Sequence, residues 1–155
     1  MTNQEVQDIN KLLAESRVIA VVGLSPKPDR ASHYVAAYLQ QHGYRIIPVN
    51  PVAAGTSILG EHVYPTLTMA AAALAEQHIL IDLVDVFRRP EEVVPIADEA
   101  IAVHAKGLWL QLGVVNEIAA AHARAAGLAV VMDRCTKIEH ARWRQNTRPT
   151  TPAQS

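Results

Sequence analysis

Two patterns of apolar residues alternate along the chain and predict strands separated by helices. Continuous apolar runs occupy residues 17–22, 44–49, 79–87, 107–111 and 128–132. Such runs are typical of strands that are buried on both faces of a parallel sheet. Helical spacing of apolar residues falls between them. The helical segments are residues 4–15, the stretch around Val35, Ala36 and Leu39, residues 68–76, a stretch opened by Pro90, and residues 116–126.

Glycine and proline set the ends of these elements. Gly43 and Gly127 follow helical segments and are suited to C-caps. Pro90 with the two glutamates after it suits a first helical turn, and Pro95 kinks that helix or resets its start. Residues 52–66 read as a loop in which residues 58–60 form a small irregular edge piece.

Strands that alternate with helices predict an α/β fold: a doubly wound parallel sheet of about five strands in a three-layer αβα sandwich. The length of 155 residues fits a single domain. We expect this domain to span residues 1–144. The polar, proline-rich residues 145–155 are expected to form a disordered tail.

Composition narrows the classes of function. The net charge is −1 and no long basic run occurs, which argues against nucleic-acid binding. No apolar run approaches the roughly 18 residues of a membrane span. Cys135 is the single cysteine, so no intramolecular disulfide forms. With a polar N-terminus, this predicts a cytoplasmic protein that binds no membrane.

Ligands of doubly wound sheets bind outside the carboxyl ends of the strands. The first such end carries Gly23 and Ser25, followed by Lys27, Arg30 and Ser32. A glycine turn, hydroxyl groups, cations and a helix N-terminus together suit a phosphate group. The alternative is that the two cations are merely solvated and that Ser32 is a helix N-cap.

The second end is Asn50-Pro51. A site for NAD favours an acidic residue here, which would accept from the ribose 2′-hydroxyl. Asn50 is neutral and does not repel a phosphorylated ribose. The alternative is that Asn50 and Pro51 form only a turn.

The third end places Arg88 and Arg89 together, where they pair either with a phosphate or with nearby carboxylates (Asp85, Glu91 and Glu92). At the fourth end, Gln111 can donate or accept in the cleft, and Trp109 is expected in the core.

Cys135 stands at the fifth end, between Arg134 and Lys137. It is either a thiol activated by those cations or a small packed hydrophobe.

Known catalytic and metal-binding patterns do not occur. The seven histidines show no metal-ligand spacing, and the chain has no nucleophile elbow or Walker loop. We therefore expect neither catalytic residues nor a metal site.

Four segments resemble one family in the order in which they occur: AVVGLSPKPDRASHYVAAYLQQHGYRIIPVNP, VDVFRRPEEV, WLQLGV and VVMDRCTKIE. The chain is similar over residues 15–140 to the small stand-alone CoA-binding proteins. These in turn resemble the CoA-binding domain of the succinyl-CoA synthetase α subunit. The resemblance implies a Rossmann-like fold that binds coenzyme A or an acyl-CoA.

The same resemblance implies the positions of the ligand. Gly23, Ser25 and Lys27 would contact the CoA phosphates, assisted by Arg30 and Ser32, with Pro26 in the same loop. Asn50 and Pro51 would lie near the ribose and adenine. Val86 and Arg88 would border the nucleotide, and Gln111 the far side of the cleft.

The chain departs from the family in two respects. Thr136 stands where the last motif usually has proline. The synthetases carry a phosphorylated histidine in a second domain, which this sequence does not continue into, so binding without catalysis is the expectation. Two alternatives stay open: an NAD(P)-dependent oxidoreductase, or a CoA-linked thiol redox role for Cys135. Assembly into a homo-oligomer or with another protein also stays open.

Overall fold

A computed structural model describes residues 1–147 and contains a five-stranded parallel sheet. The strands are β1 (Val18–Val22), β2 (Arg45–Val49), β5 (Leu83–Val86), β6 (Gly107–Leu110) and β7 (Ala129–Val131). Their order across the sheet is β2-β1-β5-β6-β7, and every pairing is parallel. The predicted doubly wound parallel sheet is therefore confirmed.

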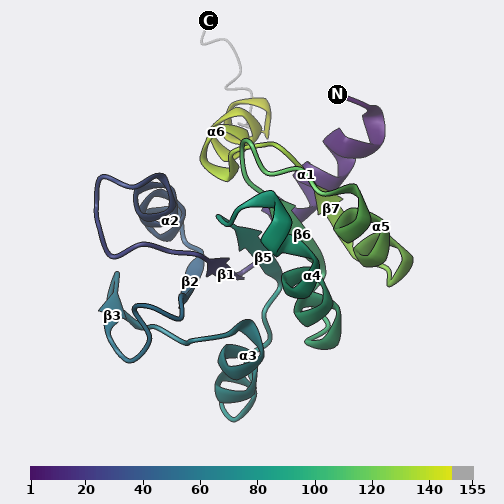
Figure 1. Ribbon diagram of the computed structural model, residues 1–155. Helices are drawn as coiled ribbons and strands as arrows, with labels where there is room; N and C mark the ends of the chain where they lie inside the picture. Colours follow the sequence, from purple (N-terminus) through teal and green to yellow (C-terminus); the bar gives the residue numbers. More distant parts are fainter. Residues whose placement is uncertain (148–155) are drawn as a thin grey trace, which may run out of the picture.

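Helices cover both faces of this sheet and complete the predicted three layers. One face carries α1 (Asn3–Glu15), α2 (Ala31–Gln41) and α6 (Thr136–Thr147). The other carries α3 (Leu67–Ala75), α4 (Val93–Ala102) and α5 (Glu117–Ala125). Figure 1 shows the strands passing between these two groups.

Alternation along β1 shows why the sheet is buried on both sides. Ile19 and Val21 pack with α1 and α2, whereas Ala20 and Val22 pack with the helices of the opposite face. All four side chains are buried. Burial on both faces explains why the strands read as continuous apolar runs rather than as alternating ones.

Three elements differ from the predicted pattern. The run at 79–87 contributes a strand of only four residues, β5, because Asp82 lies before the strand and accepts from the N–H groups of Arg17 and Val18 at 2.9 and 3.0 Å. Pro90–Glu92 forms a separate 3₁₀ turn, η1, so α4 starts at Val93 with Pro95 in its first turn. The expected edge piece is a small antiparallel hairpin of β3 (Ser57–Ile58) and β4 (Glu61–His62).

Helix α6 was not predicted from the sequence. It runs through position 144 to Thr147, and the rest of the expected tail, residues 148–155, lies outside the described part of the chain. Its buried side chains are polar: Thr136, Glu139 and His140.

The chain leaves β1 and β5 in opposite directions. The segment after β1 leads to α2 on one face, and the segment after β5 leads through η1 to α4 on the other. Neighbouring strands that diverge in this way open a crevice at their carboxyl ends. The candidate site is therefore centred between β1 and β5.

Candidate functional site

Gly23 ends β1 with a sharp turn at the centre of the crevice. Its φ is +89°, and a Cβ at this position would collide with the carbonyl oxygen of Phe87. The Gly23 N–H also donates to the Val49 carbonyl at 2.8 Å. Only glycine combines this left-handed backbone with such a close approach, so the turn depends on the absence of a side chain.

The loop from β1 to α2 is held by its own side chains. The Ser25 N–H donates to Ser32 Oγ at 2.9 Å, and the Lys27 N–H donates to Ser25 Oγ at 3.1 Å. His33 Nδ1 lies 2.8 Å from the Ser25 carbonyl, to which it donates. The idea that Ser32 is the N-cap is wrong, because the cap residue is Arg30 and the Ser32 hydroxyl turns back to the loop.

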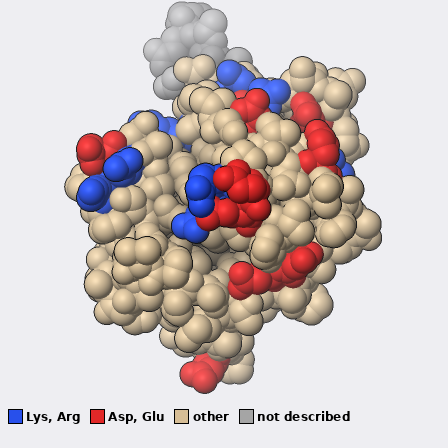
Figure 2. Space-filling view, viewed as in Figure 1, with Lys and Arg blue, Asp and Glu red and all other residues tan. Residues whose placement is uncertain are grey.

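A hollow of about 350 Å³ lies over this loop, lined by Gly23, Ser25, Lys27, Arg30, Ala31, Ser32 and Phe87. The Arg30 side chain makes no capping hydrogen bond to α2. Within residues 1–147, neither Lys27 nor Arg30 forms an ion pair. Figure 2 shows blue side chains at this loop, on the left of the face, with a red acidic side chain beside them. The first turn of α2 therefore opens into a positively charged hollow.

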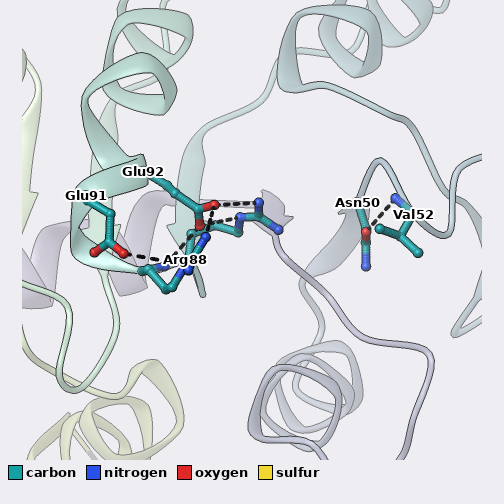
Figure 3. Close-up of polar contacts among 6 residues, drawn as sticks. Asn50, Val52, Arg88, Glu91 and Glu92 are labelled. Atoms are coloured by element: carbon teal, nitrogen blue, oxygen red, sulfur yellow. Dashed lines mark hydrogen bonds and ion pairs between the residues drawn. The ribbon is translucent and has the colours of Figure 1, made fainter.

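Asn50 ties the end of β2 to this loop. Its Nδ2 donates to the Leu24 carbonyl at 3.0 Å, and its Oδ1 accepts from the Val52 N–H at 3.0 Å (Figure 3). The second contact is a local turn, and the first joins two strand ends. Pro51 lines a neighbouring hollow of about 160 Å³ that also reaches Gly23 and Arg88.

Both arginines after β5 are paired with glutamates. Arg88 Nε lies 3.2 Å from Glu92 Oε2, and Arg89 reaches both Glu92 at 3.2 Å and Glu91 at 3.6 Å (Figure 3). The hydrogen bond from Arg89, with Arg88 nearby, lowers the pKa of Glu92. The alternative of nearby carboxylates is thus what the structure shows, with Glu91 and Glu92 as partners rather than Asp85.

A buried polar cluster lies behind the ends of β5 and β6. Gln111 Nε2 donates to Asp85 Oδ1 at 2.6 Å and to Thr136 Oγ1 at 2.8 Å, and the Thr136 hydroxyl donates to Asp85 Oδ2 at 3.0 Å. Burial raises the pKa of Asp85 to about 7, although both hydrogen bonds favour the carboxylate. Val86, beside Asp85, is fully buried and lines none of the hollows at the strand ends.

Gln111 itself lines a third hollow of about 560 Å³, which is bordered by Phe87, Arg88, Leu112 and Val114. The three hollows meet at shared walls. Phe87 borders the first and third, Gly23 the first and second, and Arg88 the second and third. Three adjoining hollows therefore lie along the carboxyl ends of the strands.

Trp109 and Cys135 lie toward the α1–α2–α6 layer. Trp109 is fully buried in the core, as expected, and donates from Nε1 to the Arg134 carbonyl at 2.8 Å. Cys135 is half-buried against that core. The flanking cations are engaged elsewhere, since Arg134 lies 3.8 Å from both Glu5 and Glu139 and Lys137 lies over two tyrosine rings.

The structure of residues 1–147 also bears on metal sites and membrane spans. No group of three or more His, Cys, Asp or Glu side chains in this part of the chain could hold a metal ion. Among the same residues, no helix is both long and apolar enough to cross a membrane.

The chain is similar in sequence to a known protein family. A family model described as a CoA binding domain matches residues 17–141. The uncharacterized protein YneT of Bacillus subtilis (strain 168) is 41% identical over 141 residues, which cover 91% of this chain and 98% of that protein.

Solved structures agree over the same length. A cell-free protein, ID.343, from Thermus thermophilus has a TM-score of 0.79 and 33% identity, covering 89% of this chain and 98% of its own. A hypothetical protein from Pyrococcus horikoshii OT3 also has a TM-score of 0.79, with 36% identity, covering 89% of this chain and 91% of its own.

Proposed function

The chain belongs to the CoA binding domain family, and from this premise we propose that it binds coenzyme A, free or as an acyl-CoA, through the diphosphate of the nucleotide. The proposed role is binding, with no reaction of its own. In this proposal Gly23, Ser25, Pro26, Lys27, Arg30 and Ser32 surround the phosphates. Asn50 and Pro51 lie beside the ribose and adenine. Val86 and Arg88 border the nucleotide, and Gln111 borders the far side of the cleft.

The observation that carries the proposal is the hollow over the β1–α2 loop. CoA brings a diphosphate and a 3′-phosphate, which need positive charge and N–H or O–H donors. The hollow offers two exposed cations without carboxylate partners in residues 1–147 and the first turn of α2. Gly23 lets the backbone approach closely. Helix N-termini with these features attract phosphate groups.

The surroundings of the hollow fit the rest of such a ligand. The amide of Asn50 carries no charge, so this side chain does not repel a phosphorylated ribose. The second and third hollows continue beyond the phosphate loop. A CoA molecule, which is long and flexible, has room on both sides of Phe87.

Isothermal titration of the purified protein with CoA, 3′-dephospho-CoA and NAD tests the proposal. We expect CoA to bind most tightly. Lys27→Ala and Arg30→Ala should each weaken CoA about tenfold, because each removes a charge-assisted contact of roughly 1.5 kcal/mol. Lys11→Ala is the matched control, since Lys11 lines a separate hollow with Lys106 and Gly127 near the amino ends of the strands.

The outcomes separate the competing functions. Tighter binding of NAD than of CoA would favour the dinucleotide-dependent oxidoreductase instead. Equal losses in Lys11→Ala and Arg30→Ala would show that the effect is overall charge rather than a site over the β1–α2 loop.

A further inference from the structure

Gln111 is a polar side chain that is almost entirely buried yet borders the crevice. Only 4% of its surface is exposed, and it lines the third hollow beside Phe87, Leu112 and Val114. Its backbone is fixed on both sides, because its N–H donates to the Val86 carbonyl at 3.2 Å and its carbonyl accepts from the Val114 N–H at 2.9 Å. The backbone of Gln111 is therefore held in place, and the remaining question is which way its side-chain amide is oriented.

Asp85 and Thr136 set that direction. Gln111 Nε2 donates to Asp85 Oδ1 at 2.6 Å and to Thr136 Oγ1 at 2.8 Å, so both amide hydrogens point inward. The Thr136 hydroxyl donates its hydrogen to Asp85 Oδ2 at 3.0 Å, so towards Gln111 it can only accept. An ionised carboxylate only accepts, so the reversed amide would place two acceptors against each other.

The amide oxygen is left facing the hollow. Within residues 1–147 no group donates to Gln111 Oε1. In the same part of the chain, no buried side-chain N or O atom lacks a partner, so Oε1 must reach the surface of the hollow. Gln111 stands on the apolar side of this hollow, beside Leu112 and Val114, and the ion-paired Arg88, Arg89 and Glu92 also line it. A fixed acceptor in that position is suited to a single N–H or O–H group of a ligand.

We propose that Asp85 and Thr136 are positioning residues that hold the Gln111 amide with its oxygen toward the third hollow, so that the site selects a ligand with an N–H or O–H donor at that point. That this ligand is CoA rests on the proposed function. CoA carries such donors in both halves: two amides and a hydroxyl in its pantetheine arm, and the adenine amino group and ribose 2′-hydroxyl in its nucleotide. The direction of the amide rests on the protein alone.

The first test needs no ligand. Solvent exchange of the Gln111 side-chain amide hydrogens is measured by NMR on ¹⁵N-labelled protein at pH 8, with exposed Gln41 as the internal reference. We expect exchange at Gln111 at least tenfold slower than at Gln41. Asp85→Asn should speed it markedly, because asparagine can donate as well as accept, and Thr136→Val should do so to a lesser degree. Thr136→Ser, which keeps the hydroxyl, should leave exchange slow.

The second test measures affinity for CoA at pH 8. Asp85→Asn and Thr136→Val should each weaken binding about three- to tenfold, the value of one hydrogen bond, and Thr136→Ser should restore it. Separate titrations with 4′-phosphopantetheine and adenosine 3′,5′-bisphosphate show which half of CoA carries the donor, since only that half should lose affinity in the variants.

Each outcome decides one step. Rapid exchange at Gln111 in the wild-type protein would overturn the fixed amide. If exchange at Gln111 is slow in the wild type but CoA affinity is unchanged in all variants, the inference that the site selects a ligand with a donor at this point is wrong. If the wild-type protein binds no CoA, the proposed function fails together with that selection, whereas the exchange measurement still decides the direction of the amide.

Discussion

Asp85 predicts an unusual dependence of stability on pH. Its carboxyl group is fully buried between β5, β6 and α6, and burial raises its pKa to about 7. In the unfolded chain an aspartate has a pKa of about 3.9. Between these two values the folded protein keeps a proton that the unfolded chain has lost, so the free energy of unfolding falls as pH rises through this window.

The magnitude follows from the two pKa values. A folded-state pKa of about 7 against about 3.9 corresponds to roughly 4 kcal/mol, at about 1.4 kcal/mol for each pH unit. Asp85→Asn removes the ionisation but keeps the size and one acceptor. The free energy of unfolding of Asp85→Asn minus that of the wild type should therefore rise by about 3 kcal/mol between pH 4.5 and pH 8, since the rest of the difference falls below pH 4.5.

The assay is urea denaturation followed by circular dichroism at half-unit steps of pH. The difference between the two proteins is the quantity to use, because His140 acts in the opposite direction. Burial, with His42 and Arg144 nearby, lowers the pKa of His140 to about 4, so its contribution is lost as pH falls below about 6.5. Asp29→Asn is the matched control, because it removes a carboxylate from the surface rather than from the core. A difference for Asp85→Asn that stays constant with pH would refute a buried carboxyl group with a raised pKa.

Three further variants test the site. Gly23→Ala should weaken CoA binding more than tenfold in calorimetric titration and cost about 1–3 kcal/mol in urea denaturation, because its Cβ meets the Phe87 carbonyl at a positive φ; unchanged affinity would contradict the tight turn. Glu92→Gln should strengthen CoA binding about two- to fivefold at low salt, since it releases Arg88 from its ion pair, and weaker binding would show that Glu92 supports the site. Cys135→Ser should leave CoA affinity unchanged, and an intact-mass adduct of CoA under mild oxidation that disappears in this variant would instead support the redox alternative.

The strands could be predicted because their burial is simple. Each lies between two layers of helices, so its apolar run is continuous and its position needs no knowledge of neighbours. Helix α6 was missed for the opposite reason. Its buried side chains are polar, so it has no apolar stripe. Thr136 and His140 contact Asp85 and Tyr38, which are distant in the sequence, and Glu139 pairs with the nearby Arg134 and Arg142.

The candidate site also combines local features, which the sequence could predict, with contacts between distant residues, which it could not. The glycine turn and the cations of the β1–α2 loop are local, and the sequence indicated them. Gln111 was expected in the cleft, but its partners were not, because Asp85 is 26 residues away and Thr136 is 25. For Arg88 and Arg89, the sequence offered both a phosphate and carboxylates, and only the folded geometry shows the pairing with Glu91 and Glu92.

The central claim is that CoA binds over the β1–α2 loop, and amide chemical-shift mapping during a titration with CoA tests it most directly. The account predicts that the shift changes are concentrated at residues 23–33 and extend to residues 111–114. A separate hollow of about 790 Å³, lined by Tyr38, His42, Trp143 and neighbouring residues of α2 and α6, provides the contrast. Shift changes centred on that hollow, or the absence of any change at residues 23–33, would contradict the account.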